Sequence, residues 1–332
     1  KKMLYDIKLE ELSDLDKKVI QNLRKDFEKL EKIPKQDYVD YTQLTVEATA
    51  NWEEAKKTNN FEIFKPYLEK IIGFNKKFIE YRGFTGHPYN TLLDDYEEGM
   101  TVEKTDEFFK KIKQELLPLI KKVNEVNKGS KKIDKVFDVI KQKEFSKFLA
   151  EYIGFDFSKG VIKESEHPFT LNFNNMDVRI TTHYYEKNLL SAIFSTIHEG
   201  GHAIYEQNIT DVISRTELGE GASMGIHESQ SRIYENVFGR NINFWIPIYP
   251  RLQEVFPENL KDVSLEEFYL IINDSKSSLI RIEADELTYQ IHVLIRYELE
   301  KEIFEKDVNV DELPKKWADK YEEYLGIRPE TF

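Results

Sequence analysis

The segment Ser195-Thr-Ile-His198-Glu199-Gly-Gly-His202-Ala-Ile-Tyr205 carries two histidines four residues apart. On a helix, residues at this spacing project from one face, one turn apart, so both imidazoles can reach one metal ion. Glu199 can then stand beside the open coordination position as a general base. The alternatives are a chance match or a buried histidine pair without a ligand, which would be costly to satisfy. The spacing favours a zinc-peptidase helix.

The residues around this motif indicate a helix inside the protein. They are apolar on nearly every side of such a helix: Leu189, Leu190, Ile193, Phe194, Ile197 and Ile204. Gly200 and Gly201 are poor helix formers, each costing roughly 1 kcal/mol relative to alanine. Two glycines in succession predict that something bulky lies against the backbone there.

The composition is that of a globular protein with a large core. The chain has 332 residues, of which 40% are hydrophobic and 33% charged, and it contains no cysteine. A metal must therefore be held by histidine and carboxylate, which suits a catalytic zinc better than a structural one. We expect one Zn²⁺ per chain, for which Co²⁺ or Mn²⁺ could substitute.

Charge and hydropathy exclude two classes of partner. A net charge of −13 argues against nucleic acid, because phosphate binding needs clustered lysine and arginine. No apolar run approaches the ~20 residues that span a bilayer. The first residues do not resemble a signal peptide. We expect a cytoplasmic protein that acts neither on nucleic acid nor at a membrane.

Helical periodicity dominates the chain and predicts a mainly α fold. Helices are expected over residues 7–30, 38–57, 61–81, 101–127, 144–153, 226–238, 243–256 (interrupted by two prolines) and 275–305, with a capping box at Ser264 and Glu267. Loops are expected at 88–101 and 219–225. Residues 176–183 alternate in polarity, and Asn174-Asn175 suits a hairpin turn. This single small sheet precedes the metal helix and either lines a peptide-binding cleft or is merely structural.

A catalytic zinc needs a third protein ligand and one open position. Glu206 would have to reach back along the metal helix, and Glu217 and Glu220 lie in a glycine-rich loop. Glu228 begins the next helix, where a rigid element makes the better site. Spacing favours Glu228 only modestly, because any of these could be surface carboxylates.

Five short motifs occur in the chain in the same order as in a known family. They are His-Pro-Phe at 167–169, Asp-Val-Arg-Ile-Thr at 177–181, His-Glu-Gly-Gly-His at 198–202, His-Glu-Ser-Gln at 227–230 and Ile-Arg-Ile-Glu-Ala-Asp at 280–285. In these the chain resembles the carboxypeptidase Taq family of zinc metallocarboxypeptidases.

The resemblance implies that His198, His202 and Glu228 bind zinc and that Glu199 is the catalytic base. It also implies a multi-helix, zincin-like fold with a deep cleft, a homodimer, and removal of single C-terminal residues from peptides with broad specificity. We expect residues 1–332 to form a single helical metallopeptidase domain. The family's opening helices and its motif Gly-x-x-Gln-Asp-x-His-Trp are not found, so we expect the middle of a longer protein that is catalytically incomplete.

Candidate substrate contacts are less specific. Arg281 is our first candidate for binding a terminal carboxylate and Arg179 the second, because a guanidinium pairs with a carboxylate in a bidentate manner. Either could instead pair with a nearby aspartate, Asp285 or Asp177. His167 and His227 could contact substrate or serve as caps and hydrogen-bond partners. Two other functions stay open: a related zinc endo-oligopeptidase, and a non-catalytic peptide-binding homologue.

Overall fold

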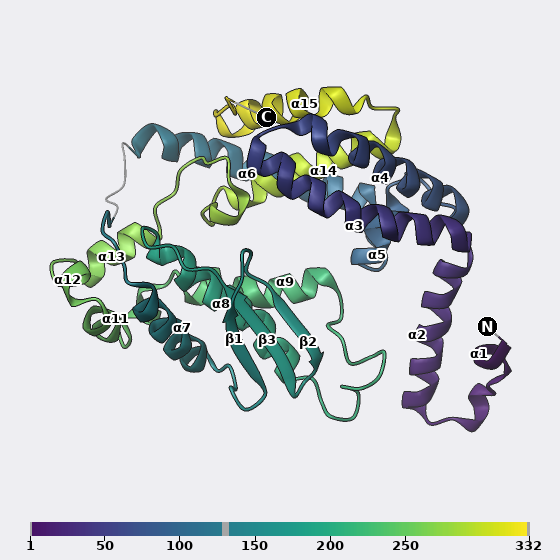
Figure 1. Ribbon diagram of the computed structural model, residues 1–332, viewed down its shortest axis with the longest axis horizontal. Helices are drawn as coiled ribbons and strands as arrows, with labels where there is room; N and C mark the ends of the chain where they lie inside the picture. Colours follow the sequence, from purple (N-terminus) through teal and green to yellow (C-terminus); the bar gives the residue numbers. More distant parts are fainter. Residues whose placement is uncertain (1, 128–132, 331–332) are drawn as a thin grey trace. The chain divides into compact units, whose positions relative to one another are not determined.

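The computed structural model describes residues 2–127 and 133–330, and these residues are mainly helical with one small sheet, as predicted (Figure 1). They divide into two compact units. The first comprises the described residues within 1–12, 20–128 and 275–332, and the second those within 13–19 and 129–274. None of the helices in the described part of the chain is both long enough and apolar enough to cross a bilayer.

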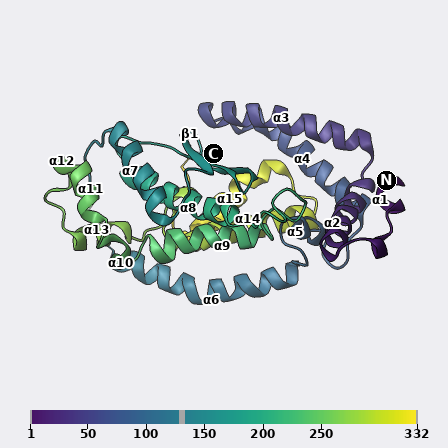
Figure 2. The same cartoon turned by 90° about the horizontal axis from the view of Figure 1, so that it is seen from below.

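The first unit is built from helices. They are α1 (Lys2–Asp6), α3 (Lys35–Thr58), α4 (Phe61–Arg82), α5 (Asn90–Tyr96), α6 (Val102–Val126), α14 (Tyr289–Glu305) and α15 (Leu313–Leu325), with 3₁₀ turns η1 (Leu9–Glu11), η3 (Arg281–Glu283) and η4 (Val310–Glu312). Helices α3 and α4 lie side by side, as the two ribbon views agree (Figure 2). The core of this unit forms where α14 packs on α6 and α15, around buried residues such as Phe109, Ile295 and Tyr321.

The second unit contains the sheet and the predicted metal helix. Its strands are β1 (Gly160–Glu164), β2 (Thr170–Asn174) and β3 (Asp177–Thr182), and its helices are α7 (Val139–Ile153), α8 (Leu189–Gln207), α9 (Met224–Arg232), the π-helical turn η2 (Ile233–Phe238), α10 (Ile242–Trp245), α11 (Tyr249–Val255), α12 (Pro257–Leu260) and α13 (Leu265–Ile272). Helix α2 (Asp14–Glu31) has residues in both units.

The sheet contains the predicted hairpin and one strand more. Strands β2 and β3 are antiparallel, with Thr170 opposite Ile180, and β1 pairs with β3 in parallel. The strand order β1-β3-β2 leaves β2 at an edge. Val178 and Ile180 are fully buried while Arg179 between them is exposed, so the alternation read from the sequence is correct here. Strand β1 was not predicted.

Helix α8 is the central element of the second unit. It begins at Leu189, where the Asn188 side chain accepts a hydrogen bond from the Ser191 N–H and caps the helix. It packs on β2 and β3 and also against α7 and α9. A helix that packs on several elements needs apolar residues on nearly every side, and Ile193 and Ile197 are buried.

The two glycines of α8 mark its closest contacts, as predicted. A Cβ atom on Gly200 would collide with the end of the Ile153 side chain from α7. A Cβ atom on Gly201 would lie 2.8 Å from the Cα of Ser231 and 3.1 Å from the Gln230 carbonyl oxygen, both in the backbone of α9. Helix α9 therefore approaches α8 backbone to backbone, which brings their side chains together.

The predicted helix over 275–305 is wrong in its first half. Residues 275–280 are not helical, a short 3₁₀ turn covers Arg281–Glu283, and α14 starts only at Tyr289. The Asp285 carboxylate accepts hydrogen bonds from the backbone N–H groups of Lys276, Leu287 and Thr288. An aspartate that binds nearby backbone in this way offers the chain an alternative to the helix.

Other predicted boundaries need smaller corrections. The helix expected over 7–30 is broken, because the Ser13 hydroxyl accepts a hydrogen bond from the Asp16 N–H and caps a new helix, α2. The loop expected at 88–101 contains α5, and the helix expected from 144 begins at Val139. The Thr101 cap and the Ser264–Glu267 capping box are both present.

Candidate metal centre

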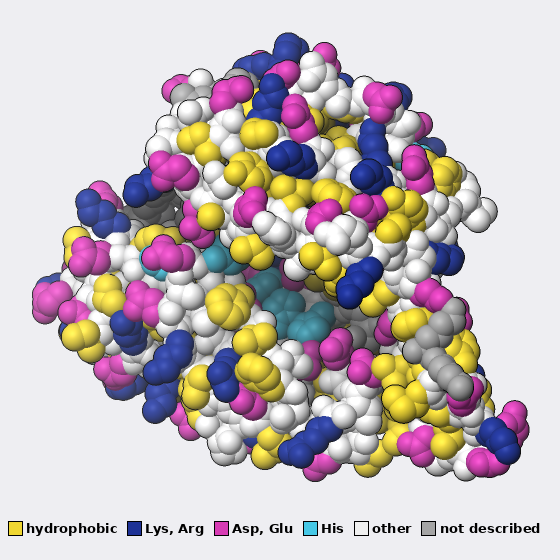
Figure 3. All heavy atoms as spheres, turned by 45° about the vertical axis from the view of Figure 1, so that its right-hand side comes forward, with side chains coloured by type: hydrophobic (Ala, Val, Ile, Leu, Met, Phe, Trp, Pro, Cys, Tyr) yellow, Lys and Arg dark blue, Asp and Glu magenta, His cyan; other side chains and the backbone are white. Residues whose placement is uncertain are grey.

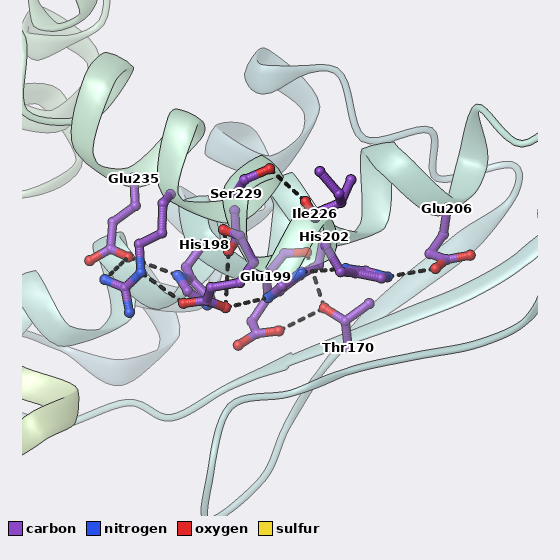
Figure 4. A network of polar contacts seen from close by, with 12 residues as sticks. Thr170, His198, Glu199, His202, Glu206, Ile226, Ser229 and Glu235 are labelled. Atoms are coloured by element: carbon purple, nitrogen blue, oxygen red, sulfur yellow. Dashed lines mark hydrogen bonds and ion pairs between the residues drawn. The ribbon is translucent and has the colours of Figure 1, made fainter. Parts of the chain in front are cut away.

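Two adjacent helices bring the candidate metal ligands together. His198, Glu199 and His202 lie on α8, and Glu228 lies on α9. Helix α9 is capped at its start by the Ser223 hydroxyl, which accepts from the Ile226 N–H at 3.2 Å. The side chains meet in the network drawn in Figure 4.

The donor atoms of the ligand group converge on one point. The Oε2 atom of Glu228 lies 3.4 Å from Nε2 of His202 and 3.7 Å from Nε2 of His198. One ligand atom from each of the three residues lies within 4.8 Å of the other two, so the group could hold a metal ion. The competing carboxylates Glu217 and Glu220 are not part of it.

The other ring nitrogen of each histidine is occupied. Nδ1 of His198 lies 2.7 Å from a carboxylate oxygen of Glu235, and Nδ1 of His202 lies 2.6 Å from Nδ1 of His227. Because Nδ1 is engaged in both rings, both Nε2 atoms are left to face Glu228. This is the usual arrangement of metal-binding imidazoles, whose second nitrogen is held by an outer partner.

An arginine holds the glutamates in place. Arg232 donates from Nε to Glu228 Oε1 at 2.8 Å and from Nη1 to Glu235 Oε2 at 3.0 Å. Burial by itself would raise the pKa of Glu228, but hydrogen bonding to His202 and the charges of His198 and Arg232 outweigh it and lower the pKa to about 2. Glu228 is therefore ionised, as a metal ligand must be.

Glu199 is buried beside this group and has its own partner. Its Oε2 atom accepts a hydrogen bond from the Thr170 hydroxyl at 2.6 Å, and Glu199 is only 7% exposed. Thr170 is the first residue of the edge strand β2. The Glu199 carboxylate is thus held toward the sheet edge by Thr170 (Figure 4).

The candidate substrate residues are more scattered. The Arg179 guanidinium pairs with Asp177 through two hydrogen bonds of 2.8 Å each, which is the alternative considered above. His167 is exposed and its Nδ1 contacts the Pro168 carbonyl oxygen. Arg281 belongs to the other unit, where Nη1 donates to the Tyr289 hydroxyl at 3.1 Å and not to Asp285.

His227 lies against the metal ligands, with both ring nitrogens engaged. Its Nδ1 contacts His202, and its Nε2 contacts Glu206 Oε1 at 2.6 Å. This pairing was not predicted from the sequence, and neither were the roles of Glu235 and Thr170. A weak signal existed for two of the partners: Glu206 follows His202 by four residues, and Glu235 follows Glu228 by seven, so each shares a helix face with a ligand.

The site is open to solvent. The side chains of His198 and His202 are 18% and 15% exposed, and that of Glu228 is 41% exposed. Histidine side chains are visible close together in Figure 3. A helix with this histidine pair, a glutamate between them and a carboxylate on the next helix is the arrangement of the metallopeptidase class.

The chain belongs to a particular family of this class. Residues 2–332 match the model of the carboxypeptidase Taq (M32) metallopeptidases. The chain is 49% identical to Carboxypeptidase 1 of Bacillus subtilis (strain 168), over 99% of this chain and 66% of that protein. It is 36% identical to Thermostable carboxypeptidase 1 of Thermus thermophilus, over 94% of this chain and 63% of that protein.

Solved structures agree with this assignment. An M32 carboxypeptidase from Deinococcus radiodurans R1 is 35% identical and superposes with a TM-score of 0.90, over 97% of this chain and 65% of that one. A crystal structure named BsuCP is 48% identical, with a TM-score of 0.93, over 99% of this chain and 67% of that one. The chain thus spans slightly less than two thirds of the curated relatives it matches. Membership of a metallopeptidase family implies a metal ion.

Proposed function

We propose that this protein is a zinc-dependent metallocarboxypeptidase that releases single C-terminal residues from peptides with broad specificity. One observation carries the proposal: in a chain of the M32 family, His198, His202 and Glu228 converge on one point beside the buried carboxylate of Glu199. The Bacillus subtilis relative is named a carboxypeptidase.

The donor set suits zinc. Two imidazole nitrogens and one carboxylate oxygen are ligands that zinc accepts, and three protein ligands leave a position open, as catalytic zinc sites do. Cobalt or manganese would fit the same atoms. When bound, the metal ion supplies Lewis acidity toward the scissile carbonyl and acidifies water.

The chain's own residues would carry the proton transfers. Glu199 would take the proton of the attacking water and later give it to the leaving amine. Thr170 would aim the carboxylate through its 2.6 Å hydrogen bond. The free edge of β2, which begins at Thr170, would pair with the extended backbone of the substrate.

Recognition of the substrate's terminal carboxylate is assigned to Arg281, with Arg179 in reserve and His167 as a further contact. Arg281 donates to the neutral Tyr289 hydroxyl, a contact that leaves the guanidinium its charge and further donors for a carboxylate. Arg179 would first have to leave Asp177. We also propose a single metallopeptidase domain with a deep cleft, a homodimer and a cytoplasmic location.

The test is metal analysis combined with a C-terminal ladder assay. Purified at the full length of its M32 relatives and loaded with one equivalent of zinc, the enzyme should shorten an unblocked peptide one residue at a time from its C-terminus. Glu199→Gln preserves size but removes the base, so zinc content should persist while turnover drops by ~10² or more.

The rival functions give different products. An endo-oligopeptidase would cut a peptide that is blocked at both ends, at internal bonds. A non-catalytic homologue would bind peptide and leave it intact, with Glu199→Gln and the native protein equally inactive. Either result would overturn the carboxypeptidase proposal.

A further inference from the structure

A chain of hydrogen bonds runs from the sheet to the candidate ligand His202. The Asn172 side chain on β2 donates to Glu206 Oε2 at 2.8 Å. Glu206 Oε1 lies 2.6 Å from His227 Nε2, and His227 Nδ1 lies 2.6 Å from His202 Nδ1. Three elements, β2, α8 and α9, therefore meet in one line of contacts that ends on the imidazole of His202. Figure 4 draws its part between Glu206 and His202.

The chemistry of the four groups fixes the direction of this chain. Glu206 is only 2% exposed, and an ionised carboxylate only accepts hydrogen bonds. His227 must therefore donate to it from Nε2. A neutral imidazole has one N–H, so His227 Nδ1 carries a lone pair and accepts from the Nδ1–H of His202. His202 is then left with a lone pair on Nε2, the atom that faces Glu228.

With His227 neutral, the opposite tautomer of His202 is unfavourable. If His202 carried its proton on Nε2, its Nδ1 would meet His227 Nδ1 lone pair to lone pair at 2.6 Å. To avoid this repulsion, His227 would have to carry its proton on Nδ1 and could no longer donate to Glu206. Of the two hydrogen bonds to the buried Glu206 carboxylate described above, the one from Asn172 would remain. Leaving a buried charged group short of a partner is costly.

We propose that Glu206, acting through His227, is a positioning residue for His202: it holds the imidazole in the tautomer that offers Nε2 to a metal ion. His198 reaches the same state more directly, because Glu235 contacts its Nδ1. The two ligands thus have a carboxylate each, one adjacent and one relayed through a second imidazole. The inference rests on the proposed metal site and replaces substrate contact as the role of His227.

The negative charge of Glu206 also makes His202 a stronger metal ligand. A carboxylate that draws on the His227 N–H makes His227 Nδ1 a better acceptor, which in turn makes His202 a better donor to the metal. Loss of an outer partner of this kind lowers metal affinity by roughly 10- to 100-fold.

The experiment measures zinc affinity by competition with a chromophoric chelator at one fixed pH. His227→Phe removes both hydrogen bonds and should raise the zinc dissociation constant about 10- to 100-fold. Glu206→Gln removes the charge and should raise it about 10-fold. His227→Gln should stay within about threefold of the native protein, because its amide oxygen can accept from His202 while its NH₂ donates to Glu206.

Asp211→Asn is the matched control. Asp211 accepts from the Asn175 side chain at 2.7 Å, much as Glu206 accepts from Asn172, but this bond joins it to the turn between β2 and β3 and not to a metal ligand. The variant loses the same charge and should leave zinc affinity unchanged. Thermal unfolding of every variant in excess chelator shows whether the metal-free fold persists.

A second readout follows the tautomers directly. In zinc-loaded protein with ¹⁵N-labelled histidine rings, His227 should carry its proton on Nε2 and His202 on Nδ1. If His227 instead carries its proton on Nδ1, the proposal is wrong. This readout uses the native protein and therefore does not depend on whether the variants fold. Unchanged affinity in folded Glu206→Gln and His227→Phe would equally overturn it. Failure of the native protein to bind zinc would instead defeat the proposed function itself.

Discussion

Gly201 on α8 faces the backbone of Ser231 on α9, and a Cβ atom added to Gly201 would lie 2.8 Å from the Ser231 Cα. Ser231 is fully buried, and its hydroxyl donates to the Glu228 carbonyl oxygen at 2.7 Å. Helix α8 carries two candidate ligands and α9 carries the third. The two helices can lie this close because Gly201 has no side chain.

Gly201→Ala should damage the metal site more than Gly200→Ala does. Alanine at 201 gains about 1 kcal/mol of helix propensity but must push back the α9 backbone, and overpacking of this kind costs about 1–3 kcal/mol. Alanine at 200 meets only the end of the Ile153 side chain, which can rotate. We expect weaker zinc binding and a lower Tm for Gly201→Ala. Equal zinc affinity in both variants would show that the interhelical spacing does not set the site.

Removing Glu228 should release zinc. Its Oε2 atom lies 3.4 Å from His202 Nε2, and no other carboxylate belongs to the ligand group found among the described residues. Glu228→Ala should lose zinc to a mild chelator that leaves the native protein loaded. Glu220→Ala, in the neighbouring loop, is the control. Full zinc occupancy in Glu228→Ala under that competition would assign the third ligand elsewhere.

Zinc affinity should decline on mild acidification. Burial by itself lowers the pKa of His198, but the hydrogen bond to Glu235 and nearby carboxylates outweigh it, so the pKa in the metal-free protein is raised above 6.5. Zinc needs the neutral ring, so protons compete as the pH falls through this raised pKa, and affinity should drop about tenfold per pH unit below it.

The measurement is a series of chelator competitions between pH 8 and pH 5.5. The decline should begin above pH 6.5, and Glu235→Gln should move its onset to lower pH because the group that raises the pKa is gone. An affinity that stays constant down to pH 6 would contradict the assignment of His198 as a ligand.

What could be predicted from sequence was local. The spacing of His198 and His202, the capping box at Ser264 and the alternation from Asp177 to Ile180 depend on neighbouring residues, and all three appear in the structure. The alternation predicted beyond Ile180 is wrong, because Thr181 and Thr182 are both buried. The contacts that were missed depend on how separate elements meet. Thr170 reaches Glu199 only because β2 lies along α8. No periodicity in the sequence could have placed it there.

The error in the first half of the helix predicted over 275–305 has a similar cause. Apolar residues recur at helical spacing through this segment, but one carboxylate, that of Asp285, binds the N–H groups of Lys276 and Leu287 and turns the chain. Strand β1 was missed because its partner β3 is parallel to it and is not the next strand in the chain. Parallel pairing leaves no turn signal between the two strands.

Thr170→Val should slow catalysis without affecting metal binding. Valine keeps the shape of threonine but removes the hydroxyl that donates to Glu199 at 2.6 Å. A hydrogen bond to a charged group contributes about 1.5–3 kcal/mol, so kcat should fall about tenfold or more. Thr170→Ser should restore most of the rate. Unaltered kcat in a zinc-loaded valine variant would mean that Glu199 needs no such support.

An exopeptidase must recognise the carboxylate one residue beyond the scissile bond, and a guanidinium pairs with it through two parallel hydrogen bonds. Arg281 donates to the Tyr289 hydroxyl and lies 6.0 Å from the Tyr289 ring centroid, in a turn that Asp285 helps to fix. In the full-length enzyme, Arg281→Ala should raise KM or lower kcat/KM for free-ended peptides, a loss of ~1.5–3 kcal/mol in transition-state stabilisation.

Peptides amidated at the C-terminus, already poor substrates, should lose much less, because they present no carboxylate for Arg281. Tyr289→Phe is the matched control, since it removes the hydroxyl that Arg281 contacts but leaves the guanidinium in the protein. It should reduce kcat/KM less than Arg281→Ala does. Arg281→Lys should recover part of the loss, because an ammonium keeps the charge but not the bidentate geometry. Equal losses on free and amidated peptides would mean that Arg281 stabilises its turn and does not bind the carboxylate.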